Sequence, residues 1–130
     1  ISKSKLMKLL ATVFFSLLMF SATAQDNLNE ATGNWAGALE LPGGQSLRIV
    51  FHISNDGKAL SATMDSPDQG AFGMKMDKAA YSDKTIELTM NQIQGTYKGT
   101  LKDGKFEGTW SQSGQSFPLH LEKVVKEGKI

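Results

Sequence analysis

Residues 95–110 read GTYKGTLKDGKFEGTW, and this stretch decides the fold because it specifies a β-hairpin in two independent ways. Asp103-Gly104 at its centre is a dipeptide that tolerates the positive φ angles of a tight two-residue hairpin turn. With the turn placed there, Tyr97 faces Trp110 and every large apolar side chain lies on one face of the hairpin. A slip of one residue would put the apolar side chains of the two halves on opposite faces. The turn and the alternation therefore predict the same register.

The same alternation of apolar and polar residues runs through most of the chain between Trp35 and Lys123. It is the period of two expected when one face of a sheet is buried. A second hairpin turn is predicted at Asp56-Gly57, which would pair Phe51 with Ala62. The pattern indicates eight short strands joined by turns, with a bulge near Asp77-Lys78 in the fourth.

These strands predict an all-β fold in which sequential neighbours are antiparallel. A sheet with one apolar face must cover that face, and joining the first strand to the eighth also removes two unpaired edges. We therefore expect a closed eight-stranded antiparallel up-and-down barrel of the calycin kind, like lipocalins or streptavidin. A two-sheet β-sandwich shows the same alternation and is the alternative.

Residues 1–24 have the organisation of a secretory signal peptide. Met7-Lys8 is followed by an apolar run from Leu9 to Phe20 and by small residues as far as Ala24, the order that signal peptides show. The run is shorter than the roughly 20 residues of a membrane-spanning helix. We expect the protein to start at Met7, to be cleaved after Ala24 and to be exported to the periplasm or the medium.

The remaining chain is expected to form one small domain, with residues 25–34 as a polar lead-in, 35–123 as the barrel and 124–130 as a charged tail or linker. All 13 acidic residues of the chain lie after residue 24, together with 11 of the 14 basic ones, so this part has a net charge of −2. Nucleic-acid binding is not indicated by that charge. The sequence contains no cysteine, so the fold must hold by core burial.

The inward-facing residues raise the question of a ligand cavity, because an eight-stranded barrel either fills with side chains or holds one small ligand. Flexible methionines opposite glycines could leave room for an apolar guest. In a domain of this size, the favoured interpretation is that methionines and aromatic residues fill the interior. The possible ligand-facing residues are Met64, Met74, Met76, Met90, Tyr97, Gly99, Phe106 and Trp110.

No sequence motif indicates catalysis, phosphate binding or a metal site, and no cofactor is expected. His52 and His120 are predicted on the outer faces of strands two and eight, too far apart to share a zinc ion, and are interpreted as solvated surface residues. Asp65 and Asp68 match no calcium-binding loop. They are expected to cap turns around Pro67 instead.

Five stretches together are similar to a known family: residues 35–37, 47–53, 62–71, 97–99 and 108–112. The most specific is Asp-Ser-Pro-Asp-Gln-Gly at residues 65–70. The set resembles the small N-terminal β-domain of secreted bacterial serine hydrolases, both esterase-like α/β-hydrolases and relatives of serine β-lactamases. In that family the catalytic serine and its partners belong to the domain that follows, so the resemblance supplies no catalytic residue here.

The resemblance implies a non-catalytic, exported accessory or binding module rather than an enzyme, with a serine hydrolase domain as its partner in the same or another chain. A possible docking loop consists of Asp65, Ser66, Pro67, Asp68, Gln69 and Gly70, and an ordered turn that only shapes one barrel mouth is the alternative. The other function considered is a free-standing calycin-like carrier of a small apolar ligand. Neither function involves nucleic acid or, after signal cleavage, a membrane.

Overall fold

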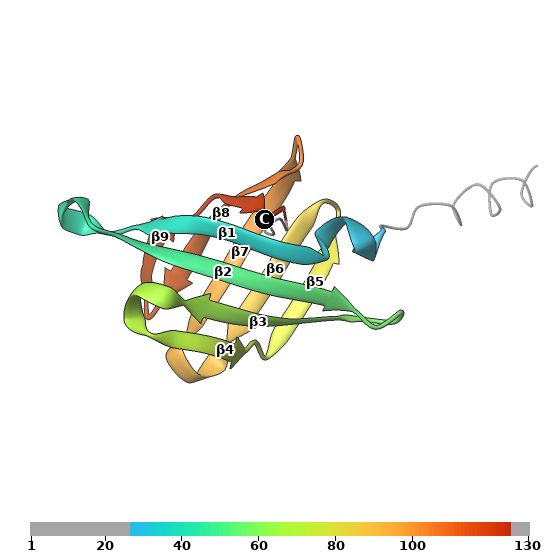
Figure 1. Ribbon diagram of the computed structural model, residues 1–130, viewed down its shortest axis with the longest axis horizontal. Helices are drawn as coiled ribbons and strands as arrows, with labels where there is room; N and C mark the ends of the chain where they lie inside the picture. Colours follow the sequence, from blue (N-terminus) through green and yellow to red (C-terminus); the bar gives the residue numbers. More distant parts are fainter. Residues whose placement is uncertain (1–26, 126–130) are drawn as a thin grey trace, which may run out of the picture.

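The computed structural model describes residues 27–125, which form an all-β domain (Figure 1). The predicted signal peptide and most of the predicted tail lie outside the described residues. The strands are β1 (Gly33–Glu40), β2 (Ser46–Asn55), β3 (Leu60–Ser66), β4 (Ala71–Lys75), β5 (Lys78–Ser82), β6 (Thr85–Met90), β7 (Gly95–Lys102), β8 (Lys105–Gln112), β9 (Gln115–Pro118) and β10 (Leu121–Lys123). Short 3-10 helices occur at η2 (Leu28–Ala31), η3 (Pro42–Gly44), η4 (Pro67–Gln69) and η5 (Asn91–Ile93).

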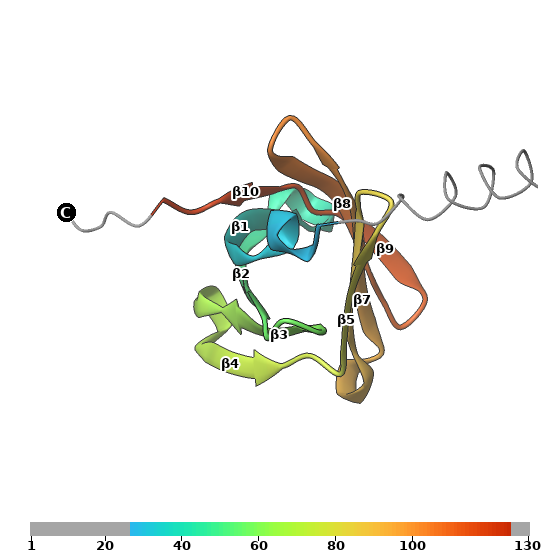
Figure 2. The ribbon, with the colours of Figure 1, turned by 90° about the vertical axis from the view of Figure 1, so that its right-hand side faces the viewer.

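These strands belong to one antiparallel sheet in the order β4-β3-β2-β1-β10-β8-β7-β6-β5, with β9 paired to β8 beside this path. The sheet is strongly curled, so that the half formed by β1 to β4 faces the half formed by β5 to β9 (Figure 2). The apolar faces of both halves point into the space between them. The alternation seen in the sequence therefore buries one side of each strand.

The sheet is an open half-barrel, so the predicted closed eight-stranded barrel is wrong. The expected fourth strand is divided into β4, which pairs with β3, and β5, which pairs with β6. Between them the N–H of Met76 donates to the carbonyl of Ala62 at 2.9 Å, and the N–H of Asp77 donates to that of Thr89 at 2.7 Å. Since successive N–H groups point in opposite directions along an extended chain, the segment crosses from one half of the sheet to the other. The predicted bulge is thus a complete break.

On the side away from this break, the two halves of the sheet join as expected, because the end of the predicted eighth strand lies between β1 and β8. We call this junction the closed seam, and the break between β4 and β5 the open seam. In β10, Lys123 pairs with Trp35 and Leu121 pairs with Phe106. This connection makes the two halves one continuous sheet, whereas a β-sandwich would have two separate sheets. The eighth strand is also divided, into β9 and β10, and the N–H of Leu119 in the break donates to the carbonyl of Gly108 at 2.9 Å.

The β7–β8 hairpin has the predicted register, with Tyr97 opposite Trp110. Asp103 and Gly104 at its turn have φ angles of 53° and 79°, the left-handed region that a two-residue hairpin turn requires. The predicted pairing of Phe51 with Ala62 in the β2–β3 hairpin is wrong, because Phe51 lies opposite Met64.

The β2–β3 turn explains this shift of two residues. The side chain of Asp56 accepts hydrogen bonds from the N–H groups of Lys58 and Ala59 at 2.8 and 2.9 Å. This capping stabilises a longer loop between Asn55 and Leu60 instead of a two-residue turn at Asp56-Gly57. A shift by two residues leaves each side chain on its predicted face.

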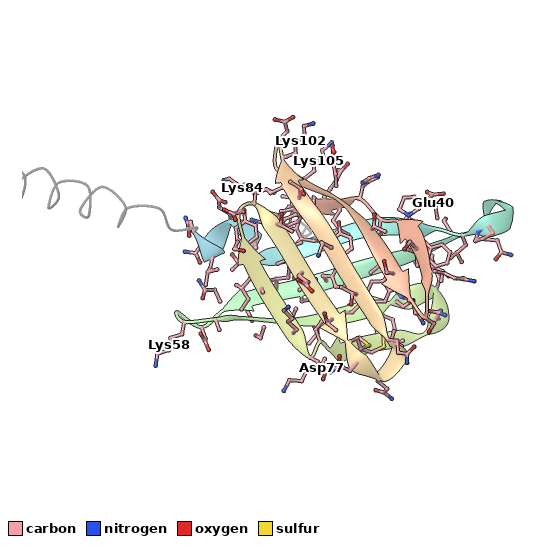
Figure 3. The ribbon with its side chains drawn as sticks, turned by 180° about the vertical axis from the view of Figure 1, so that it is seen from behind. Glu40, Lys58, Asp77, Lys84, Lys102 and Lys105 are labelled. Carbon is pink, nitrogen blue, oxygen red and sulfur yellow. The ribbon has the colours of Figure 1, made fainter. Side chains whose placement is uncertain are left out.

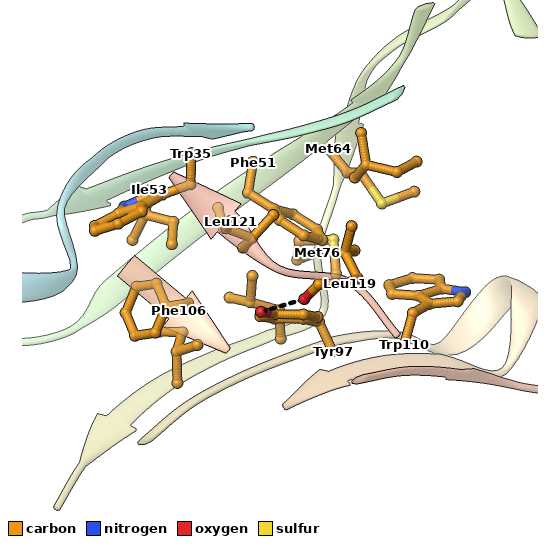
Figure 4. Packing of buried hydrophobic residues seen from close by; sticks show 14 of the residues in the cluster. Trp35, Phe51, Ile53, Met64, Met76, Tyr97, Phe106, Trp110, Leu119 and Leu121 are labelled. Carbon is orange, nitrogen blue, oxygen red and sulfur yellow. Dashed lines mark hydrogen bonds between the residues drawn. The ribbon is translucent and has the colours of Figure 1, made fainter. Parts of the chain in front are cut away.

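Aromatic side chains fill the interior between the two halves (Figure 4). Trp35, Phe51, Tyr97 and Phe106 are all at most 1 % exposed. The ring centroids of Trp35 and Phe106 are 4.6 Å apart, and those of Phe51 and Tyr97 are 5.5 Å apart. The hydroxyl of Tyr97 donates to the carbonyl of Leu119 at 2.8 Å, and burial raises the pKa of this hydroxyl.

Two glycines of the β7–β8 hairpin make room for the side chain of Tyr97. A Cβ atom at Gly99 would lie 2.6 Å from the Tyr97 hydroxyl oxygen, and one at Gly108 would lie 2.5 Å from it. Neither distance is compatible with a normal contact between these atoms. The space beside these glycines is therefore occupied by a side chain of the protein itself.

Candidate functional site

The predicted ligand-facing residues divide into core residues and residues at an opening. Within this set, Met64, Met76, Met90, Tyr97, Gly99, Phe106 and Trp110 are buried, whereas Met74 is half-buried. The structure brings Met74 and Met90 together with Ile93 at an opening of about 460 Å³ beside β4. Phe106 instead lies in the aromatic core, beside Trp35 (Figure 4).

This opening follows from the break between β4 and β5, which leaves one edge of β4 without a strand beside it among residues 27–125. Its polar rim includes Lys75, Asp77 and Asn91. The carboxylate of Asp77 accepts a hydrogen bond from the N–H of Asn91 at 2.7 Å, which ties the break to the start of η5. An apolar floor with a polar rim is an arrangement that suits a small apolar ligand with one polar end.

The predicted docking loop, Asp65–Gly70, is fixed by hydrogen bonds to a neighbouring strand. Asp68 accepts three hydrogen bonds from Arg48: from its backbone N–H at 2.9 Å, from Nε at 3.2 Å and from Nη2 at 3.0 Å. The side-chain bonds from Arg48 are the largest cause of the lowered pKa of Asp68. Ser66 is buried and its hydroxyl donates to Oε1 of Gln69 at 2.7 Å. The loop is therefore an ordered feature of the surface.

A polar network that starts at this loop connects residues of four strands, β1 to β4. Asp65 Oδ1 accepts a hydrogen bond from the N–H of Gly73 at 2.7 Å, and Asp65 Oδ2 lies 2.8 Å from Nε2 of His52. The other ring nitrogen of His52, Nδ1, lies 2.7 Å from Oδ1 of Asn34. The hydrogen bond from Gly73, followed by that from His52, lowers the pKa of Asp65.

Two sequence-based interpretations are corrected by these contacts. His52 was expected to be a solvated surface residue, but both of its ring nitrogens have partners. Asp65 and Asp68 were expected to cap turns around Pro67, but they hold Gly73, His52 and Arg48 instead. His120 is exposed, as predicted.

An exposed aromatic ring adjoins the loop, and sequence reasoning did not single it out. Phe72 in β4 is 65 % exposed, unlike the other phenylalanines described. Regular alternation would not have identified it, because Phe72 is two residues from inward-facing Met74 and would lie on the same face. In the structure the β3–β4 register shifts between Met64 and Ser66. The hydrogen-bonded loop, residues 65–70, and Phe72 together form a surface that we call the loop face.

Residues 27–125 contain no group of three or more His, Cys, Asp or Glu side chains that could hold a metal ion. The same residues contain no helix long and apolar enough to cross a membrane. Comparison of the chain with protein-family models, with curated proteins and with solved structures finds no match.

Proposed function

We propose that this chain is a non-catalytic, exported accessory module, with a calycin-like β-scaffold, that docks onto a serine hydrolase domain through the loop face. In this proposal the chain itself carries no enzymatic activity. Its contribution is to pack against the catalytic domain or to shape the approach of the substrate.

The observation that carries this proposal is the exposed ring of Phe72 beside a loop that is already held in place. Burying a phenylalanine side chain is worth about 1.5–3 kcal/mol, so a ring that is 65 % exposed retains much of that free energy for a partner. The three hydrogen bonds from Arg48 to Asp68 fix the neighbouring loop before any partner arrives. A surface that is ordered in advance loses less conformational entropy on binding.

The sequence of the loop supports the choice of partner. Asp-Ser-Pro-Asp-Gln-Gly at residues 65–70 is the most specific part of the resemblance to N-terminal β-domains of serine hydrolases. In that family a catalytic domain follows the β-domain. A docking loop is the part of such a module whose sequence would depend on the partner.

The direct test is the intact mass of the native exported protein, detected with an antibody raised against residues 25–130. We expect a mass well above that of residues 25–130, because a catalytic domain belongs to the same chain. A mass equal to that of residues 25–130 would contradict docking within one chain and leave only a separate partner protein.

In the larger protein, Phe72→Ser should lower the melting temperature and speed proteolysis between the two domains. Lys102→Ser, at the exposed tip of the β7–β8 hairpin, is the matched control and should change neither. Equal behaviour of the two variants would contradict the loop face as the docking surface. The isolated module should hydrolyse neither ester nor β-lactam reporters.

A second candidate function, carriage of a small apolar ligand, rests on the opening lined by Met74, Met90 and Ile93. A fluorescent apolar probe should then bind saturably and be displaced by lipids. Met74→Gln should weaken that binding, whereas Lys98→Gln on the other half of the sheet should not. Absence of saturable binding would remove this function.

A further inference from the structure

A row of four polar side chains crosses the outer face of the β1–β4 half. The register places Asn34 opposite His52, His52 opposite Thr63, and Thr63 opposite Lys75. Adjacent strands are about 4.8 Å apart, so the backbone positions that carry the amide, imidazole, hydroxyl and ammonium groups follow one another at that spacing. Lys75 also belongs to the rim of the apolar opening, whereas Asn34, His52 and Thr63 do not.

Two members of the row have no partner among the described residues. The ammonium group of Lys75 is not in any of the ion pairs formed within residues 27–125. The hydroxyl of Thr63 likewise has no hydrogen bond there, while His52 is held between Asn34 and Asp65. A fixed imidazole thus stands beside two free donors.

The row lies in a depression of about 440 Å³ on the sheet surface. Gly73 forms part of its lining, and a Cβ atom added to Gly73 would meet nothing within 4 Å. Its φ angle of 66° is one that residues with side chains rarely adopt. The backbone conformation therefore keeps this part of the depression open.

Two further hydroxyls line the same depression, those of Ser54 and Ser61, whose oxygens are 2.9 Å apart. Each is two residues from the row along its strand, Ser54 from His52 and Ser61 from Thr63. Two residues of a strand span about 6.7 Å. Thr63 and the pair of hydroxyls are therefore separated by roughly the length of a monosaccharide, and Lys75 lies one strand beyond Thr63.

We propose that this depression binds a small polyhydroxylated carboxylate, such as a sugar acid. The carboxylate lies between the ammonium of Lys75 and the hydroxyl of Thr63, and the ligand's own hydroxyls pair with Ser54 and Ser61. The nearby carboxylate of Asp65 accepts the N–H of Gly73 with one oxygen and lies 2.8 Å from the ring of His52 with the other, so both of its oxygens already have partners.

The opposite half of the sheet shows what an ordinary solvated row looks like. There Glu87 lies opposite Lys98, and Lys98 opposite Thr109, so a carboxylate of the protein stands beside the cation. Glu87 also pairs with Lys78 at 3.4 Å. This outer face, seen in Figure 3, offers a lysine–threonine pair whose charge is balanced within the sheet. Lys98→Gln is therefore the matched control for Lys75→Gln.

The test is a titration of the ¹⁵N-labelled protein with glucuronate, glucose and acetate, followed by amide chemical shifts. Glucuronate should shift the amides of His52, Thr63, Gly73 and Lys75 saturably. Glucose lacks the carboxylate and acetate lacks the hydroxyls, so each should bind at least about tenfold more weakly, the ratio that one charge-assisted hydrogen bond supplies.

Lys75→Gln and Thr63→Val should each weaken glucuronate binding by about tenfold or more, whereas Lys98→Gln should leave it unchanged. The exposed position of Lys75 makes unfolding of this variant unexpected, and its amide spectrum shows directly whether it is folded. No saturable shift with glucuronate would overturn the proposal. Acetate binding as tightly as glucuronate, or equal effects of Lys75→Gln and Lys98→Gln, would also overturn it.

Discussion

The two seams of this curled sheet differ in how they join its halves. At the closed seam, β10 lies between β1 and β8, and the buried side chains of Trp35 and Phe106 pack together behind it. At the open seam, β4 and β5 pair with different strands, and single hydrogen bonds from Met76 and Asp77 replace a ladder. Buried core side chains lie at the closed seam, whereas the open seam has polar groups, an apolar opening and the exposed ring of Phe72.

This difference predicts different consequences for substitutions at the two seams. The apolar side chains of the closed seam, such as Trp35, Phe106 and Leu121, are buried, so their removal creates cavities. Side chains around the open seam are held by hydrogen bonds at the surface, where individual contacts are worth less. We therefore expect substitutions to affect stability strongly at the first seam and ligand or partner binding mainly at the second.

The largest effect is expected for Phe106→Ala, which should lower the free energy of unfolding by about 3–5 kcal/mol because it leaves a cavity in the core. The matched variant at the open seam is Phe72→Ala, which should change stability by less than about 0.5 kcal/mol because its ring is already exposed. Urea unfolding measures both. Similar losses for the two variants would remove the distinction between the seams.

A smaller loss, about 1–3 kcal/mol, is expected for Tyr97→Phe, because the buried carbonyl of Leu119 loses its hydrogen-bond donor. Tyr81→Phe is the comparison, since its hydroxyl bonds Glu30, and Glu30 also keeps two hydrogen bonds from Lys84. Urea unfolding of Tyr97→Phe with no greater loss than Tyr81→Phe would show that the buried bond contributes nothing.

At the open seam, Asp77→Ala should cost about 1 kcal/mol, the typical net value of a hydrogen bond. The variant removes the acceptor for the N–H of Asn91, so hydrogen exchange at Asn91 should become faster. Asp103→Asn in the β7–β8 turn is the control, because asparagine suits the same turn. Unchanged exchange at Asn91 would contradict the role given to Asp77.

As the pH is lowered, the hydrogen bonds of the loop face should weaken before those of the β7–β8 hairpin. Hydrogen bonds from Gly73 and Arg48 lower the pKa values of Asp65 and Asp68 in the folded protein. A carboxyl whose pKa is lowered by folding contributes stability above its unfolded pKa of about 3.9, and loses it as the pH falls toward the folded value. Amide shifts of Arg48 and Gly73 should therefore change below about pH 4.

Asp68→Asn is the variant that checks this acid response. It should reduce the response at Arg48 while leaving that at Gly73, which depends on Asp65. A pH response at Arg48 that is the same in Asp68→Asn and in the original protein would assign the effect to another group.

Much of the strand pattern could be predicted from the sequence, since alternation and the Asp103-Gly104 turn specify the same register. The closure of the end of the chain against Trp35 was also predictable, because an apolar sheet face must be covered. The open seam was not, because a bulge and a complete break at Asp77 produce the same interruption of the alternation. Only the direction of successive backbone N–H groups distinguishes them.

The polar network was missed for a related reason. With the β2–β3 turn placed at Asp56-Gly57, Asp65 would lie opposite Arg48 and away from His52. In the structure the longer loop moves Asp65 opposite Val50, which is two residues before His52 in β2. From there the carboxylate of Asp65 reaches the imidazole. A shift of two residues preserves every predicted face and still changes which side chains meet.

We expect the loop face, and not the closed seam, to be the surface that meets a partner. The most direct measurement compares amide hydrogen exchange of the isolated module, residues 25–130, with exchange of the same residues in the intact native protein. We expect slower exchange in the native protein over residues 65–72 and unchanged exchange in the β7–β8 hairpin. Unchanged exchange over residues 65–72, or slowing confined to the hairpin, would contradict the claim.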